Sequence, residues 1–167
     1  MNNRVILAVT NDLNGDQRIH KVALSLVRLG YQPELVGRLL PSSTALNRPY
    51  RTRRFKLLFH KGPIFYAEYN WRLFIYLLFT DASIFLANDL DTLSAVYLAG
   101  LIRRKKVVYD SHEYFTEVPE LVGRKWVKRA WTTIERWIFP HLKNVYTVNN
   151  SIARIYESKY HVSVQVI

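Results

Sequence analysis

Cysteine is absent from this sequence of 167 residues. Its absence excludes disulfide bonds, a thiol nucleophile and cysteine-ligated metal sites, and it favours a reducing compartment. Long apolar runs are lacking as well, because the longest, LFIYLLF at 73–79, is far shorter than the roughly 20 residues of a membrane-spanning helix. The N-terminal residues become polar too early for a signal peptide. We therefore expect a cytoplasmic protein.

Acidic residues are scarce: 13 Asp and Glu stand against 24 Lys and Arg, and the net charge is +11. Such a charge favours an anionic partner, and a nucleic acid, an anionic membrane surface and a phosphorylated small molecule all meet that requirement. Hydrophobic residues make up 49% of the chain and aromatic residues 14%, which excludes a disordered chain. The length suits one domain with its own core.

The hydrophobic pattern alternates between strand-like runs and helical spacing. Strand-like runs lie at 4–10, 32–40, 52–59, 82–88, 105–110, 143–149 and 162–167. Helical spacing lies at 16–30, 65–79, 92–104, 123–142 and 151–160, and Pro140 is expected to end the fourth helix. Repeated strand–helix units require crossovers, so we predict an α/β domain. Its core is a Rossmann-like, doubly wound, mostly parallel sheet of about seven strands with helices on both faces.

Polar side chains gather where the predicted strands end, which is where open α/β sheets bind ligands. Folding is expected to bring six acidic residues to one edge of the sheet: Asp12, Asp89, Asp91, Asp110, Glu113 and Glu117. Asp16 and Asp91 are also expected to cap helices, since aspartate is a favoured N-cap residue. His112 and Glu113 are not favoured capping residues, which favours a functional role for that pair.

The loop NDLNGDQR at 11–18 precedes a predicted helix, whose free N–H groups favour a phosphate. Gly15 would let the backbone approach a ligand closely. The loop has one glycine rather than the G-x-G-x-x-G fingerprint. The second strand ends in Val36, Gly37 and Arg38, without the acidic residue that holds a ribose. NAD binding is therefore not expected.

Asp89, Leu90 and Asp91 have the D-x-D form, which in some sugar transferases holds a divalent metal. Two carboxylates in three residues are frequent by chance, and a metal needs further oxygen ligands in good geometry. We therefore predict no metal site and no tightly bound cofactor.

Basic and aromatic residues are interleaved at 123–139, and positive charge is also dense at 48–56. Four residues share one face of the predicted helix: Trp126, Ala130, Ile134 and Trp137. One interpretation is an amphipathic helix that packs on the sheet with its charges in solvent. The other is attachment to an anionic lipid surface through Lys125, Trp126, Lys128 and Arg129. No nucleic-acid recognition motif is present, so we expect no nucleic-acid partner.

Several stretches carry a family resemblance: NDLNGDQRIHKVALSLVRLGY, ANDLDTLSAVYLA, VVYDSHEYFTEVPEL, IERWIFPHLKNVYTVNNSIARIY and the terminal VSVQVI. Through them the chain resembles the N-terminal half of a retaining GT-B glycosyltransferase of the glycosyltransferase family 4 group. YDSHEYFTE, with NDLDTL upstream, is the most specific part of the match. In that family, two Rossmann-like domains face each other across a cleft.

The resemblance implies that residues 1–167 form the acceptor-side domain, one half of a GT-B fold. The C-terminal domain, which would hold the nucleotide-sugar, would then lie outside this chain. VSVQVI resembles the last strand before the interdomain linker, so we expect a sequence cut at a domain boundary. The chain alone is expected to be inactive, and the nucleotide-sugar is expected as a co-substrate rather than a bound cofactor.

The resemblance also implies roles for individual residues. His112 resembles the histidine that approaches the donor sugar near its hydroxyls, and it is the expected catalytic residue. The expected substrate-binding residues are Asn14, Gly15, Asp16, Asp89, Asp91, Glu113 and Glu117. The first three resemble the family's glycine-containing loop near the donor phosphate, and the two aspartates 89 and 91 would line the acceptor side.

The expected function is therefore acceptor binding in a nucleotide-sugar-dependent retaining glycosyltransferase of the hexosyltransferase type, active in cell-surface glycan or polysaccharide assembly. The expected partners are a sugar or lipid-linked acceptor, the nucleotide-sugar, and the anionic inner face of the cytoplasmic membrane. One alternative is the N-terminal half of another GT-B-type enzyme, such as a sugar-nucleotide epimerase. Others are a non-catalytic module that binds anionic lipid and a flavodoxin-like regulator, although no flavin or phosphorylation constellation is recognisable.

Overall fold

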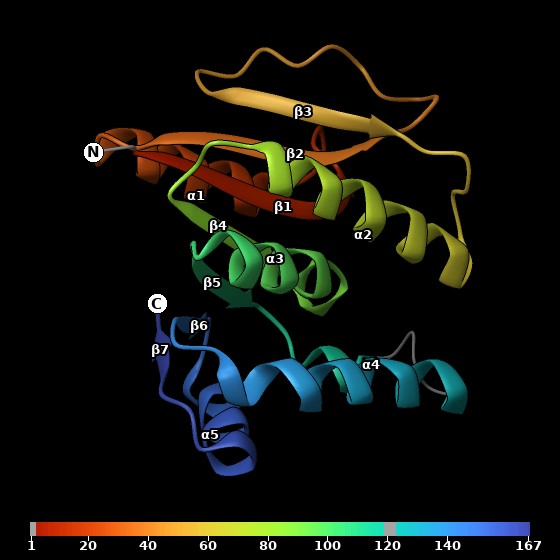
Figure 1. The fold of residues 1–167 in the computed structure, drawn as a ribbon, viewed down its shortest axis with the longest axis vertical. Coiled ribbons are helices and arrows are strands. Elements are labelled where there is room, and N and C mark those ends of the chain that lie inside the picture. The colour runs from red at the N-terminus through yellow and green to blue at the C-terminus, as the bar shows by residue number, and fades with distance from the viewer. Residues whose placement is uncertain (1–2, 119–122) are drawn as a thin grey trace.

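The computed structural model describes residues 3–118 and 123–167. Seven strands form one sheet in the order β3-β2-β1-β4-β5-β6-β7 (Figure 1). The strands are β1 (Arg4–Asp12), β2 (Gln32–Leu39), β3 (Arg51–Lys56), β4 (Ile84–Asn88), β5 (Lys106–Ser111), β6 (Val145–Thr147) and β7 (Val164–Val166). The helices are α1 (Gln17–Arg28), α2 (Gly62–Phe79), α3 (Leu90–Arg103), α4 (Lys125–Ile138) and α5 (Asn150–Tyr160), with short 3-10 turns η1 (Phe115–Glu117) and η3 (Phe139–His141).

The sheet is parallel throughout and covered on both faces. Side chains along β1 alternate between two hydrophobic clusters: Ile6 and Ala8 pack with α2, α3, α4 and α5, whereas Val5, Leu7 and Val9 pack with α1. In Figure 1, α2, α3 and α4 lie in front of the sheet and α1 lies behind it. The predicted doubly wound, Rossmann-like α/β sheet is confirmed.

The direction in which strands are added to the sheet reverses at β1. The chain proceeds from β1 to β2 and β3 on one side, and then returns to β4, β5, β6 and β7 on the other. At such a switch point the loops after the two central strands separate, and open α/β sheets bind their ligands there. The candidate residues lie at the carboxyl ends of β1, β4 and β5 or just beyond them, so the topology gathers them at this edge.

Several elements end elsewhere than the hydrophobic pattern predicts. β3 ends at Lys56 rather than at 59, because the N–H groups of Leu58 and Phe59 both donate to Glu68 Oε2 at 2.9 Å instead of pairing with a strand. α2 begins at Gly62 rather than at 65, and Pro63 in its first turn is the signal of that start. The terminal strands β6 and β7 have three residues each, shorter than the predicted runs 143–149 and 162–167.

Helix α2 is rich in apolar residues and covers the end of β1. Its buried face consists of Phe65, Tyr69, Leu73 and Leu77. The Tyr69 hydroxyl donates a hydrogen bond to the carbonyl oxygen of Val9, which ties the helix to the strand that leads into the candidate site.

Within residues 3–118 and 123–167, no helix has both the length and the apolarity needed to cross a bilayer.

Helix α4 turns a different face inward from the one its sequence favours. The buried residues are Trp131, Glu135 and Ile138. Trp126 and Trp137 keep 82% and 56% of their surface exposed, so the interpretation that their face packs on the sheet is wrong. Three of the four residues proposed for lipid attachment are exposed on this helix: Lys125, Trp126 and Arg129. Their attachment to lipid stays a prediction.

Candidate substrate-binding site

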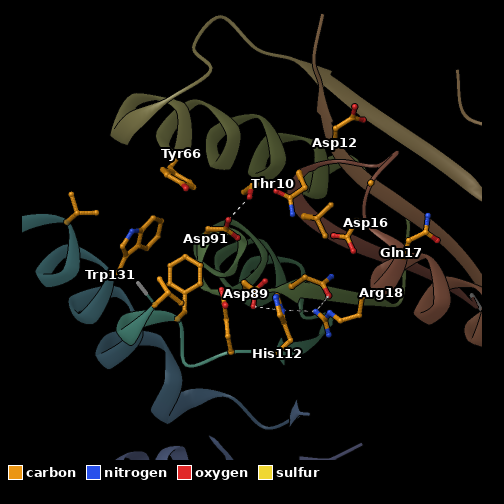
Figure 2. A pocket seen from close by; sticks show the side chains of 18 of the residues that line it. Thr10, Asp12, Asp16, Gln17, Arg18, Tyr66, Asp89, Asp91, His112 and Trp131 are labelled. Carbon is orange, nitrogen blue, oxygen red and sulfur yellow. Dashed lines mark hydrogen bonds and ion pairs between the residues drawn. The ribbon is translucent and has the colours of Figure 1, made fainter. Parts of the chain in front are cut away.

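A cavity of about 850 Å³ opens at the carboxyl edge of the sheet. Its lining comes from the loops after β1, β4 and β5 and from α2 and α4. Part of the lining is polar or charged: Asp12, Asp16, Arg18, Asp89, Asp91 and His112. Another part is apolar or aromatic: Tyr66, Phe115, Val118, Val127 and Trp131. Figure 2 shows Tyr66 and Trp131 on the opposite side of this cavity from Asp16 and Arg18.

The loop between β1 and α1 contributes Gly15 and Asp16 to the cavity, but not Asn14. The Asp16 carboxylate accepts a hydrogen bond from the Ile19 N–H at 3.1 Å, so the prediction that Asp16 caps α1 is confirmed. Asn14 donates instead to the hydroxyl of Thr44 at 3.0 Å. A Cβ atom on Gly15 would meet no atom within 4 Å, so the backbone of this residue is accessible to a ligand.

Asp89 is held in a strained backbone conformation between β4 and α3. Its φ of 63° and ψ of 168° fall in a region nearly confined to glycine, at a cost on the order of 1–3 kcal/mol. The Asp89 N–H donates to the carbonyl oxygen of Asp110 at 2.9 Å, which joins this turn to the end of β5. The conformation directs the Asp89 carboxylate toward His112.

Asp91 lies inside the first turn of α3, because Asp89 occupies the N-cap position. The prediction that Asp91 caps this helix is therefore wrong. Its carboxylate instead accepts a hydrogen bond from the hydroxyl of Thr10, at the end of β1. Burial raises the pKa of Asp91 to about 7, and the negative charge of Asp89 adds to this effect. Asp91 is thus partly protonated near neutral pH, where it can donate as well as accept a hydrogen bond.

His112 follows β5, and its Nδ1 has two neighbours. Asp89 Oδ1 lies 2.9 Å away and Arg18 Nη2 lies 3.0 Å away. The hydrogen bond with Asp89 raises the pKa of His112, against the opposing effect of burial. When Nδ1 carries a proton it donates to Asp89, and Nε2 is then the ring nitrogen left to meet a ligand.

Arg18 is a site residue that the sequence did not indicate. Its Nη1 contacts both carboxylate oxygens of the fully buried Asp110, at 2.9 and 2.8 Å. Its Nη2 donates to Asn88 Oδ1 at 3.3 Å, and the Tyr146 hydroxyl donates to Asp110 at 2.8 Å. Asp110 does not line the cavity. Its buried carboxylate instead holds the Arg18 guanidinium, which does line it. The sequence feature that could have indicated Arg18 is its place in the first turn of a predicted helix, where the helix dipole disfavours positive charge.

The acidic residues after β5 separate in the structure. Glu113 lines the cavity, whereas Glu117 is outside the lining and pairs with Lys128 Nζ at 2.6 Å. Asp12, the last residue of β1, lines the cavity and accepts a hydrogen bond from the Ser43 hydroxyl at 2.7 Å. Folding therefore brings most of the predicted rim together, with Asp110 and Glu117 committed to protein partners.

An aromatic wall is the second feature that the sequence analysis missed. The ring of Trp131 meets that of Tyr66 with centroids 5.2 Å apart and that of Phe115 with centroids 5.4 Å apart, both edge to face. These three residues come from α4, α2 and the turn after β5. Helical periodicity marks Tyr66 and Trp131 at most as core residues, because their shared cavity exists only after the helices pack.

The two carboxylates of the D-x-D sequence are engaged separately, Asp89 with His112 and Asp91 with Thr10. Among the residues that the structure describes, no group of three or more His, Asp and Glu side chains is arranged to hold a metal ion.

The sequence profile of Glycosyltransferase Family 4 matches residues 16–167. The chain belongs to glycosyltransferase family 4. The match includes Asp16, Arg18, Asp89, Asp91 and His112, so the polar part of the cavity falls largely within the family 4 region. A comparison with curated protein sequences finds no significant match.

Solved structures similar to this family 4 chain have a GT-B glycosyltransferase fold. Sucrose-phosphate synthase from Thermosynechococcus elongatus superposes with a TM-score of 0.68 at 11% identity, over 98% of this chain and 86% of that one. Os79 from O. sativa, in complex with UDP and deoxynivalenol-3-glucoside, gives 0.63 at 12% identity, over 96% of this chain and 51% of Os79. The family 4 chain therefore spans about half of Os79. The resemblance to the N-terminal domain of a GT-B glycosyltransferase is confirmed.

Proposed function

We propose that this domain binds the acceptor in a nucleotide-sugar-dependent, retaining glycosyltransferase of the hexosyltransferase type. The observation that carries the proposal is the cavity in which His112, held by Asp89, meets carboxylates from the ends of β1 and β4. Membership of glycosyltransferase family 4 supports the class of reaction. The carboxylates support a sugar ligand, because sugar hydroxyls donate hydrogen bonds to carboxylate oxygens.

His112 is the proposed catalytic residue. Asp89 holds Nδ1, so Nε2 is the atom that donates a hydrogen bond to an oxygen of the donor sugar. Because its pKa is raised, the His112 imidazole stays protonated to a higher pH than the imidazole of a free histidine. Retaining transfer passes through an oxocarbenium-like state, and the Asp89 carboxylate supplies negative potential for its positive charge.

The mixed lining of the cavity supports an acceptor with a polar and an apolar part. Hydroxyl groups of the acceptor would lie against Asp12, Asp16 and Asp91, and its apolar part would lie against Tyr66 and Trp131. Lipid-linked sugars have this composition, and aromatic rings also stack on the apolar faces of sugar rings. Such acceptors suit the assembly of cell-surface glycans or polysaccharides, which we propose as the process served.

The test is a transfer assay on the complete protein with a panel of nucleotide-sugars and with free and lipid-linked sugar acceptors. We expect release of the nucleotide and a product whose anomeric configuration, measured by NMR, is that of the donor. His112→Gln should lower kcat/KM by about a hundredfold or more. His141→Gln, which replaces an exposed histidine outside the cavity, is the matched control and should leave kcat/KM unchanged. An inverted product, or full activity of His112→Gln, would refute the proposal.

A further inference from the structure

An exposed apolar stripe runs along α2 on the side opposite its buried face. Ile64, Trp71, Ile75 and Phe79 recur at helical spacing, with 58%, 65%, 37% and 83% of their surfaces exposed. The helix therefore presents apolar residues both to the sheet and to its outside. A surface helix of a globular domain normally turns polar residues outward. The apolar outer face of α2 is therefore typical of an interaction surface.

The stripe continues into the turn that precedes α2, where Leu58 and Phe59 are 76% and 46% exposed. The backbone N–H groups of Leu58 and Phe59 donate to Glu68, which holds this turn beside α2. Arg72 Nη2 pairs with the same carboxylate at 2.8 Å. Glu68 is the one acidic residue within 62–79, and its charge is thereby balanced.

Positive charge is concentrated in the segment that precedes the stripe in the sequence. Residues 35–67 include no Asp or Glu and carry seven Lys and Arg: Arg38, Arg48, Arg51, Arg53, Arg54, Lys56 and Lys61. Several of them are on the edge strand β3 and its following turn, next in the chain to Leu58 and Phe59. Aromatic and aliphatic side chains beside such a basic segment are complementary to the headgroup layer of an anionic bilayer.

We infer that the β3–α2 surface docks on an anionic membrane. This surface is defined as Leu58, Phe59, Ile64, Trp71, Ile75 and Phe79 with Lys56 and Lys61. The inference does not depend on the proposed transferase reaction. Tyr66, in the first turns of the same helix, lines the cavity beside Trp131, so docking would set the aromatic wall near the bilayer. An acceptor anchored in lipid would then reach the cavity without leaving the membrane.

The test is co-sedimentation of the complete protein with vesicles of phosphatidylcholine alone or mixed with phosphatidylglycerol. We expect binding to the mixed vesicles only, weakened by added salt because the cations are screened. Trp71→Ser combined with Phe79→Ser should lower the partition coefficient by about tenfold or more, since two apolar side chains no longer enter the interface. The matched control is Leu29→Ser, which removes a residue that is 72% exposed at the end of α1, on the other face of the sheet.

A double substitution of lysines tests the contribution of positive charge to the β3–α2 surface. Lys56→Gln combined with Lys61→Gln should weaken binding to the mixed vesicles, whereas Lys21→Gln on α1 should not. Circular dichroism checks that each variant stays folded. Equal binding of the serine variant and the parent, or equal binding to both kinds of vesicle, would overturn the inference. So would loss of binding through Trp126→Ser alone, which would place contact on α4, or a dimer in light scattering that the serine variant dissolves.

Discussion

His112 and Asp89 meet where two neighbouring strands end, with His112 Nδ1 2.9 Å from Asp89 Oδ1. β4 and β5 pair in parallel register, Ala87 opposite Tyr109 and Asn88 opposite Asp110. The residues that follow these strands are therefore carried to adjacent positions, although they are 23 positions apart in the chain. The register of the sheet creates this pair, and the strained backbone of Asp89 orients it.

Asp89→Asn should lower the pKa of His112 toward 6.5, because a neutral amide does not stabilise the imidazolium. NMR titration of the histidine ring protons measures the change. A folded-state pKa above the unfolded value means that the pair stabilises the fold below 6.5, and that this stability is lost as pH rises through the raised pKa. The stability advantage of the parent over the variant should therefore shrink with rising pH. Asp81→Asn, at a side chain 80% exposed, should leave the His112 titration unchanged.

Asp91→Asn should make the domain less sensitive to pH. Between 3.8 and about 7, the unfolded chain ionises Asp91 while the folded domain keeps it protonated, so the parent loses stability as pH rises through this window. The asparagine keeps a partner for the Thr10 hydroxyl and does not ionise. We expect the difference in melting temperature, variant minus parent, to increase by several degrees as the pH rises through that window. A constant difference in melting temperature would contradict the raised pKa.

Arg18→Gln should reduce the free energy of unfolding by about 3 kcal/mol, because it leaves the buried Asp110 carboxylate without its cation. Urea denaturation measures this loss. Arg28→Gln, at the exposed end of the same helix, should change stability by less than about 0.5 kcal/mol. Combining Arg18→Gln with Asp110→Asn should recover much of the loss, and failure to do so would mean that Arg18 stabilises the domain through other contacts.

Substitution by alanine should affect stability differently at two glycines near the loop after β1, Gly37 and Gly15. A Cβ atom at Gly37 would come within 2.6 Å of the Asn11 carbonyl oxygen and 2.4 Å of Leu13 Cδ2, so Gly37→Ala must displace the loop after β1. We expect it to cost about 1–3 kcal/mol in urea denaturation. Gly15→Ala should leave stability unchanged, since its Cβ meets open space. If the backbone of Gly15 contacts a donor phosphate, Gly15→Ala will raise KM for the nucleotide-sugar in the complete protein without destabilising it.

Local patterns in the sequence were sufficient for the order of strands and helices. Apolar runs such as 4–10 and 82–88, separated by helical spacing, already imply a parallel sheet, because parallel neighbours require crossovers. Element ends were less predictable where tertiary contacts intervene. β3 stops early because Glu68, ten residues beyond Leu58, takes the N–H groups of that turn. The inward face of α4 was misassigned because tryptophans occur on both of its sides.

The sequence by itself determined the family 4 fold and the edge of the sheet on which Asp16, Asp89, Asp91 and His112 lie, since periodicity and strand-end position are local properties. Only the tertiary structure decided which side chains act together. It buried Asp110 beneath Arg18, turned Asn14 and Glu117 away from the cavity, and brought Tyr66 and Trp131 into contact. It also left Trp71 and Phe79 facing outward. These outcomes depend on strand register and helix packing between segments distant in the chain, which no local pattern encodes.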